Sequence, residues 1–185
     1  MKTKEDIIDV IREDSWMMEI LRVARTLNLP DWWVCAGFVR SKIWDVLHGF
    51  SARTPLQDVD VIYYDPVKTD EAIEKILEGK LLELKPDIPW SVKNQARMHV
   101  INNLPPYSSS VEGIANFPET VTALGVKLEE NDRIILAAPW GIEDVVDLTV
   151  KPTPLFSTNE LRKVYDARVT KKNWKATWNL LKKIT

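Results

Sequence analysis

The fold of this chain is decided by the stretch VCAGFVR at residues 34–40, together with DVDV at residues 58–61. The apolar start of the first segment predicts a short buried strand over residues 32–35, which Gly37 ends. A short helix is expected over residues 41–48. The second segment opens a β-branched and aromatic strand over residues 58–64. The alternation of strands and helices along the chain predicts a mixed α+β domain.

Asp58 and Asp60 stand two residues apart on the predicted strand, so their carboxylates point to the same face. Carboxylate oxygens at this spacing suit Mg²⁺, a hard cation that is commonly held by one or two carboxylates together with substrate phosphates. Without a cation the two groups repel each other, which raises the pKa of one of them. The alternative is a solvated strand edge, where charges discourage pairing with another sheet. Taken alone, Asp-x-Asp favours that alternative, because so short a motif often arises by chance.

The turn at Ala36 and Gly37 adds a geometry that suits an anion. A strand that runs through a glycine into a helix presents backbone N–H groups and the positive end of the helix dipole. Gly37 allows the backbone to approach a ligand closely, and Arg40 can add a forked, charge-assisted contact. A triphosphate is such an anion. The alternative is an ordinary strand-to-helix turn followed by a surface arginine.

In this order the two segments resemble the head domain of the CCA-adding tRNA nucleotidyltransferases, within the polymerase β-like superfamily. That family carries Gly-Gly-x-Val-Arg-Asp ahead of an Asp-x-Asp strand. Four residues of this chain match the pattern, namely Gly37, Arg40, Asp58 and Asp60. Ala36 and Ser41 depart from the pattern, and both flank the phosphate turn. A second resemblance, to small bacterial nucleotidyltransferase-like proteins, spans most of the chain and includes WSVKNQARMH at residues 90–99 and KPTP at residues 151–154.

The resemblance implies a nucleotidyltransferase head fold, with a mixed central sheet flanked by helices. It also implies metal-dependent transfer of a nucleotide from a nucleoside triphosphate to an unknown acceptor, such as RNA or another molecule with a hydroxyl group. Mg²⁺ or Mn²⁺ would be held by Asp58 and Asp60, and the phosphates by Ala36, Gly37 and Arg40. A complete CCA-adding enzyme is not expected, because the chain ends where the helical tRNA-binding domains would begin. The alternatives are a catalytically weak or inactive nucleotide- or RNA-binding module and a protein-interaction domain.

The third catalytic carboxylate of such folds is harder to place. We take Asp147 as the candidate, because it has apolar neighbours on a strand predicted over residues 145–150. Asp144 and Glu143 are nearby rivals, and all three also fit a helix-start or loop acid. Arg97 is expected on a strand within residues 90–101, on the same face as Lys93, where it would contact phosphate.

The remaining periodicity predicts further elements and one boundary. These are a helix over residues 4–27, a helix over residues 69–78 that Gly79 ends, a loop over residues 102–110, a helix over residues 117–124, a strand over residues 134–137 and a linker over residues 151–154. We expect a nucleotidyltransferase-like domain over residues 1–156 and a basic helical tail over residues 157–185, packed on the same domain. The tail holds 8 Lys+Arg against 2 Asp+Glu, whereas the rest holds 17 against 25.

The composition is that of an ordinary globular protein, with 45% hydrophobic and 28% charged residues. The first residues lack the apolar run of a signal peptide, and no stretch approaches the ~20 apolar residues of a membrane span. One cysteine excludes an intramolecular disulfide. A cytoplasmic protein without a membrane partner is therefore expected.

Overall fold

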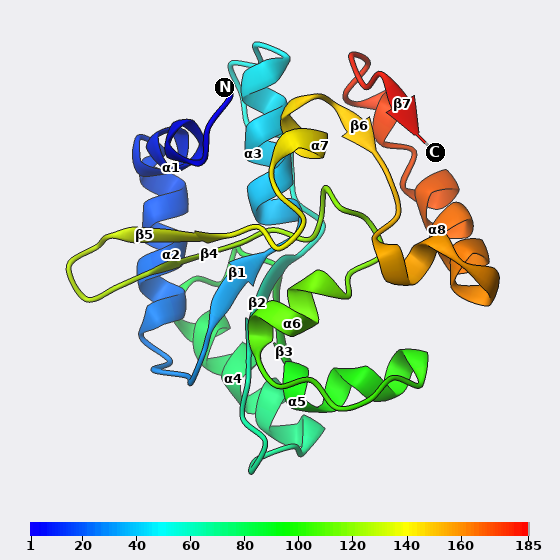
Figure 1. Ribbon diagram of the computed structural model, residues 1–185. Coiled ribbons are helices and arrows are strands. Elements are labelled where there is room, and N and C mark those ends of the chain that lie inside the picture. The colour runs from blue at the N-terminus through cyan, green and yellow to red at the C-terminus, as the bar shows by residue number, and fades with distance from the viewer. Residues whose placement is uncertain (185) are drawn as a thin grey trace.

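The computed structural model describes residues 1–184, apart from the side chains of residues 159, 183 and 184. Its centre is a five-stranded mixed sheet in the order β3-β2-β1-β4-β5 (Figure 1). The strands are β1 (Trp33–Cys35), β2 (Val59–Tyr63), β3 (Trp90–Asn94), β4 (Gly125–Leu128) and β5 (Ile134–Ala137). The neighbours β2 and β3 are parallel, and the other neighbouring pairs are antiparallel. The predicted α+β class, a mixed sheet flanked by helices, is confirmed.

Four helices pack on this sheet and bury the main core of the protein with it (Figure 1). They are α1 (Lys4–Arg12), α2 (Ser15–Arg25), α3 (Gly37–Leu47) and α4 (Glu71–Leu84). The remaining elements are α5 (Gln95–Met98), the 3-10 helix η1 (His99–Asn102), α6 (Ser110–Ala115), α7 (Glu143–Val146), β6 (Thr149–Val150), the 3-10 helix η2 (Pro154–Ser157), α8 (Asn159–Lys172), the 3-10 helix η3 (Trp174–Ala176) and β7 (Lys183–Ile184). The last strand, β7, pairs in parallel with β6.

Successive side chains of β2 point alternately into the main core and to the opposite face of the sheet. Val59 and Val61 point into the main core and are fully buried. Ile62 points to the other face of the sheet, where it meets Ile114 of α6 in a much smaller apolar cluster. Asp60 shares the face of Ile62 because residues two apart on a strand point the same way. The second face is therefore the one that carries polar chemistry.

The predicted helix over residues 4–27 is two helices, and Asp14 is the reason. Its carboxylate accepts a hydrogen bond from the backbone N–H of Met17 and so caps the start of α2. The same carboxylate pairs with Lys42 and Arg53. A side chain that accepts hydrogen bonds from backbone N–H groups can end one helix and begin the next, while the apolar residues on either side keep helical spacing.

Gly79 does not end its helix, which was predicted to stop there. The chain continues helically to Leu84, because Leu81 is fully buried and the gain from packing it exceeds the helix propensity lost at one glycine. Near the middle of the chain, residues 117–124 are turns and not the predicted helix. The helix α6 forms instead within and just beyond the predicted loop, where Ser109 accepts a hydrogen bond from the Glu112 amide. The strand β4 was not predicted.

The C-terminal residues pack against the sheet domain. Residues 151–154 are not a free linker, since Thr153 is buried and its hydroxyl donates to the Phe117 carbonyl at 2.7 Å. Trp174 and Trp178 meet the Trp44 ring edge to face, with ring centroids 5.7 and 5.1 Å apart. Within the described part of the chain, none of the helices has the length and apolar character that a membrane crossing requires.

Candidate nucleotide and metal site

A polar cavity of about 340 Å³ lies beside the start of α3. Asp58 and Asp60 line it from the beginning of β2, while Ala36, Gly37 and Arg40 line it from the β1–α3 turn and the first turns of α3. The antiparallel pairing of β1 with β2 sets Cys35, the last residue of β1, opposite Asp60. The two motifs therefore meet because their strands are neighbours in the sheet.

The carboxylate pair carries an unfavourable charge arrangement. Asp60 is half-buried, and Asp58, the residue before β2, is exposed. Burial, and then repulsion from Asp58, raises the pKa of Asp60 to about 6. A hydrogen bond from Ser91, its register partner on β3, opposes this rise only in part. A cation bound between the carboxylates would remove the repulsion.

Arg40 is held in an aromatic enclosure. Its guanidinium carbon lies 4.5 Å from the ring centroid of Trp174, 5.1 Å from that of Trp44 and 5.5 Å from that of Trp178. The side chain is buried, and that burial lowers its pKa to about 10, so it stays charged at neutral pH.

Few of the donors on this guanidinium are used. Nη2 donates to the Ser41 hydroxyl at 3.2 Å, whereas Nε of Arg40 is buried without a hydrogen-bond partner among the described residues. No ion pair to Arg40 is present in the described part of the chain either. A buried charged donor that lacks a partner is costly unless a ligand supplies one, and an anion in the cavity would do so.

The start of α3 adds backbone donors to the same cavity. Among the described residues no side chain caps this helix, so the N–H groups of its first turn have no side-chain partner. Ala36, the residue before the helix, has φ 55° and ψ −118°. This conformation is strained for any residue with a Cβ and normal for glycine. The departure of Ala36 from the Gly-Gly pattern therefore leaves a glycine-type turn in place, built with an alanine.

The strain predicts that Ala36→Gly will stabilise the protein. Relief of the positive φ is worth about 1–3 kcal/mol and the extra flexibility of glycine in the unfolded chain offsets roughly 0.5–1 kcal/mol of it. The free energy of unfolding in urea should therefore rise, by about 1 kcal/mol. Ala123→Gly is the matched control, because Ala123 is buried without a positive φ and its replacement should destabilise. Equal destabilisation by both substitutions would contradict the assigned strain.

Two further cations reach the cavity from α8. Arg168 and Lys172 both line it. The Nε of Arg168 donates to Glu119 at 2.7 Å, and Glu119 is fully buried and also accepts from the Thr122 hydroxyl at 2.7 Å. Lys172 donates to the side chain of Gln57 at 2.9 Å. Sequence reasoning did not single out these residues; the only signal was the excess of basic residues beyond Thr158. No local pattern marks Glu119.

Asp147, the candidate for a third carboxylate, does not line the cavity. The segment expected as a strand is the short helix α7 followed by β6, and Asp147 is an exposed residue at the end of that helix. Its rival Asp144 pairs with Lys151 and Thr120, and Glu143 is exposed. No cluster of three acidic, His or Cys side chains suited to a metal occurs among the described residues. Among the residues that the structure describes, the carboxylates of Asp58 and Asp60 alone line the cavity.

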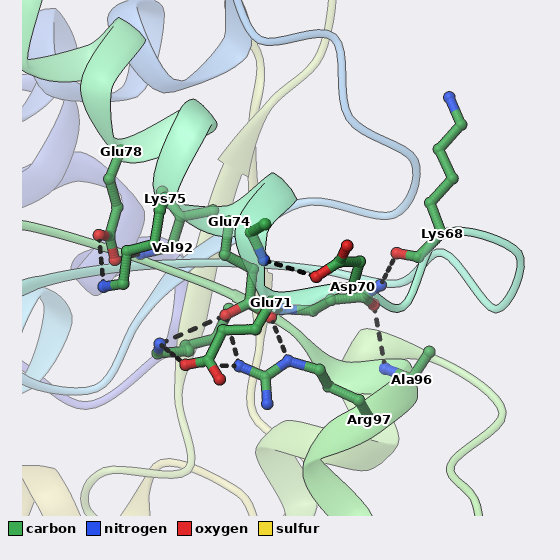
Figure 2. A network of polar contacts seen from close by, with 12 residues as sticks. Lys68, Asp70, Glu71, Glu74, Lys75, Glu78, Val92, Ala96 and Arg97 are labelled. Atoms are coloured by element: carbon green, nitrogen blue, oxygen red, sulfur yellow. Dashed lines mark hydrogen bonds and ion pairs between the residues drawn. The ribbon is translucent and has the colours of Figure 1, made fainter.

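Arg97 also lies elsewhere, because the predicted strand ends at Asn94 and α5 follows it. The guanidinium makes two hydrogen bonds to Glu74, at 2.7 and 2.6 Å (Figure 2). Arg97 does not line the polar cavity. Glu74 also accepts from the Asn94 amide at 2.8 Å and pairs with Lys93 at 3.3 Å. Arg97 is thus a structural partner of a buried carboxylate.

Comparisons with known proteins agree with this geometry. A family model described as nucleotidyltransferase matches residues 22–183. A solved structure described as an NMR structure that reveals a CCA-adding enzyme head domain is 37% identical, with a TM-score of 0.89 over 100% of this chain and 97% of that one. No curated protein matches the sequence.

More distant structures share the fold alone. The Thermotoga maritima CCA-adding enzyme complexed with tRNA is 14% identical, with a TM-score of 0.61 over 97% of this chain and 42% of that one. A complex of a CCA-adding enzyme with ATP is also 14% identical, with a TM-score of 0.61 over 97% of this chain and 43% of that one. This chain therefore spans less than half the length of either enzyme.

Proposed function

The chain belongs to the nucleotidyltransferase family and has the head-domain fold of CCA-adding enzymes, and we propose that it transfers a nucleotide from a nucleoside triphosphate to a hydroxyl acceptor with Mg²⁺ or Mn²⁺. One observation carries this proposal. The carboxylate pair of Asp58 and Asp60 shares a cavity with a buried guanidinium, that of Arg40, which has no anionic partner among the described residues. The site thus presents a place for a cation beside a place for an anion.

The residues present fit a divalent cation. Asp58 and Asp60 offer hard oxygen donors two residues apart on one strand face, and a bound cation would relieve the burial cost and the mutual repulsion that raise the pKa of Asp60. Mg²⁺ is commonly held by one or two carboxylates together with substrate phosphates. When bound, the cation would neutralise phosphate charge and make the attacking hydroxyl more acidic. Mn²⁺ suits the same oxygen donors.

The residues of the chain itself would bind and orient the triphosphate. Arg40 and Lys172, which form no ion pair with a described residue, bring two positive charges to the cavity. Arg168 lines it while paired with Glu119, and the uncapped start of α3 adds backbone N–H groups. These groups would hold the β- and γ-phosphates and stabilise the charge that develops on departing pyrophosphate. Glu119, which is fully buried, keeps the Arg168 guanidinium in position through a part-buried hydrogen bond.

A second candidate function rests on the lack of a third acid among the described residues that line the cavity. With two carboxylates at the site, the protein would bind a nucleotide and transfer it slowly or not at all. The proposals differ in one measurement, since both require nucleotide binding and only the first requires transfer of an α-labelled nucleotide to RNA, to protein or to a small molecule.

Titration with ATP, CTP, GTP and UTP tests the shared part of the proposal. Trp174 and Trp178 line the cavity, so their fluorescence reports on its occupation. We expect saturable binding in Mg²⁺ and much weaker binding in EDTA. Arg40→Met should weaken binding about 100-fold, because it removes charge-assisted hydrogen bonds worth roughly 3 kcal/mol. Arg133→Met is the control, because Arg133 is exposed and outside the cavity. Absence of binding in the wild type would exclude both functions.

A further inference from the structure

A second cavity, of about 400 Å³, adjoins the polar one across the sheet face that carries Asp60. The two cavities share Ala36, Asp60, Thr122 and Arg168 as lining residues. The second cavity is lined from α5, α6 and α8 and by no residue of α3. Several of its side chains are apolar, namely Ile62, Met98, Ile101, Phe117, Phe156 and Val164. Its size and lining are those of a site for a small organic molecule.

Two neutral polar groups face this cavity with hydrogen-bonding capacity to spare. Gln95 is 3% exposed and Tyr107 is 6% exposed, and neither the Gln95 amide nor the Tyr107 hydroxyl has a hydrogen-bond partner among the described residues. Gly113 makes room for the amide, since a Cβ at Gly113 would lie 2.4 Å from the Gln95 side-chain oxygen. Neither the amide nor the hydroxyl is among the fully buried unpaired atoms, so both are accessible in the cavity and free to contact a ligand.

The charges around this cavity do not favour a polynucleotide. Its two cationic lining residues are already paired, Lys93 with Glu74 at 3.3 Å and Arg168 with Glu119 at 2.7 Å. Its rim is apolar, with Ile101 66% exposed and Val164 49% exposed. Binding of RNA relies on phosphate contacts from free Lys and Arg side chains. An uncharged ligand suits this lining better.

We propose that the second cavity binds the acceptor substrate, and that the acceptor is a small uncharged molecule with an apolar ring or chain and a hydroxyl group. This inference rests on the proposed function. In an in-line displacement the attacking and leaving oxygens lie on opposite sides of the α-phosphorus. With pyrophosphate leaving toward Arg40, the attacker approaches from the side of Asp60 that the second cavity borders. The hydroxyl oxygen bonds to the α-phosphorus, the bond to the bridging oxygen breaks, pyrophosphate departs and the hydroxyl proton passes to water.

Methyl NMR with the uncharged aromatic alcohol indole-3-ethanol tests this assignment. Met98 lines the cavity, whereas Met17 and Met18 lie in the main core and serve as internal controls. We expect the alcohol to shift the Met98 methyl signal alone and to bind equally well with and without Mg²⁺ and ATP. Gly113→Ala and Gln95→Leu should each weaken binding of the alcohol about tenfold, the value of one lost hydrogen bond.

Three results would overturn the assignment. The first is a Met98 methyl signal that the alcohol does not shift. The second is competition between the alcohol and Mg²⁺–ATP. The third is a single-stranded RNA dodecamer that also shifts the Met98 signal and binds more tightly than the alcohol. Nucleotide titration of the same samples separates this inference from the proposed function. Absence of nucleotide binding in the wild type, with binding of the alcohol, would refute the proposed function and with it the acceptor role, and would leave the cavity as a binding site for the alcohol. Retained nucleotide affinity in the Gly113 and Gln95 variants shows that those proteins are folded.

Discussion

Asp60→Asn is expected to lower the rate of nucleotidyl transfer by about three orders of magnitude. The substitution keeps the shape of the side chain and removes one of the two charges that would hold the divalent cation. Electrostatic assistance by a metal is worth several kcal/mol, and about 4 kcal/mol corresponds to a thousandfold change in rate. The measurement is transfer of an α-labelled nucleotide to cellular RNA, to protein or to a small hydroxyl compound.

Asp87→Asn is the matched control, because Asp87 is exposed and lines neither cavity. It should transfer at the wild-type rate. Asp58→Asn should resemble Asp60→Asn, since both carboxylates face the same cavity. Unchanged transfer by both Asp58→Asn and Asp60→Asn would show that the carboxylate pair has no catalytic role.

Asp60→Asn should also make the metal-free protein more stable at neutral pH. The pKa of Asp60 is about 6 in the folded protein, against 3.8 for an ordinary aspartate. Above pH 6 the group is charged in both states, and the folded state carries the cost of burial and of repulsion from Asp58. Below pH 3.8, the ordinary pKa of an aspartate, Asp60 is protonated in both the folded and the unfolded state, so that cost disappears. The melting temperature of Asp60→Asn should therefore exceed that of wild type at pH 8 and approach it near pH 4; a constant difference would contradict the assigned pKa.

Glu74→Gln is expected to reduce the free energy of unfolding by about 3–5 kcal/mol at pH 7. Glu74 is fully buried, and its two oxygens accept from Arg97, Lys93 and the Asn94 amide (Figure 2). Removal of one partner leaves Arg97 and Lys93 partly buried without the charge that balances them. Breaking a buried pair in this way is strongly destabilising. Urea denaturation followed by circular dichroism measures the change.

Glu71→Gln is the control that isolates burial. Glu71 contacts the same Arg97 at 3.4 Å, but its side chain is 62% exposed. An exposed pair contributes about 1 kcal/mol or less, so the free energy of unfolding should change little. Equal effects of the two substitutions would show that burial of Glu74 is not the source of its contribution.

The effect of Glu74→Gln should also depend on pH. Burial raises the pKa of Glu74, but hydrogen bonds from Arg97, Asn94 and Lys93 outweigh burial and lower the pKa below the ordinary 4.5. The stability from the charged group is therefore present above that value and is lost as the pH falls through the lower, folded-state pKa. The difference between wild type and Glu74→Gln should narrow in this acidic range. A difference that grows on acidification would contradict the assigned direction.

The sequence by itself determined the fold class and five of the residues that line the polar cavity, namely Ala36, Gly37, Arg40, Asp58 and Asp60. The glycine turn at Gly37, the arginine one helical turn later and the two aspartates on the next strand follow from local chemistry, because a strand alternates its faces and a turn needs particular residues. Their order along the chain carried the resemblance that the comparisons confirm. The strands β1, β2 and β5 were predicted to within a residue or two for the same reason, since their apolar patterns are local.

Tertiary structure alone decided which other groups join that site. Arg168 and Lys172 reach the cavity because Trp174 and Trp178 pack on Trp44, which brings the end of α8 back to the sheet. Conversely, Arg97 and Asp147 lie outside the predicted site, because their segments fold as short helices and not as the predicted strands.

The physical reason is that helix caps and contacts between distant residues leave no periodic signal in a single sequence. Glu119 stands 49 positions from Arg168 and shares no motif with it, yet burial forces the two together. The local pattern thus predicted four residues that line one cavity, namely Gly37, Arg40, Asp58 and Asp60, and packing of distant segments decided which other charges surround them.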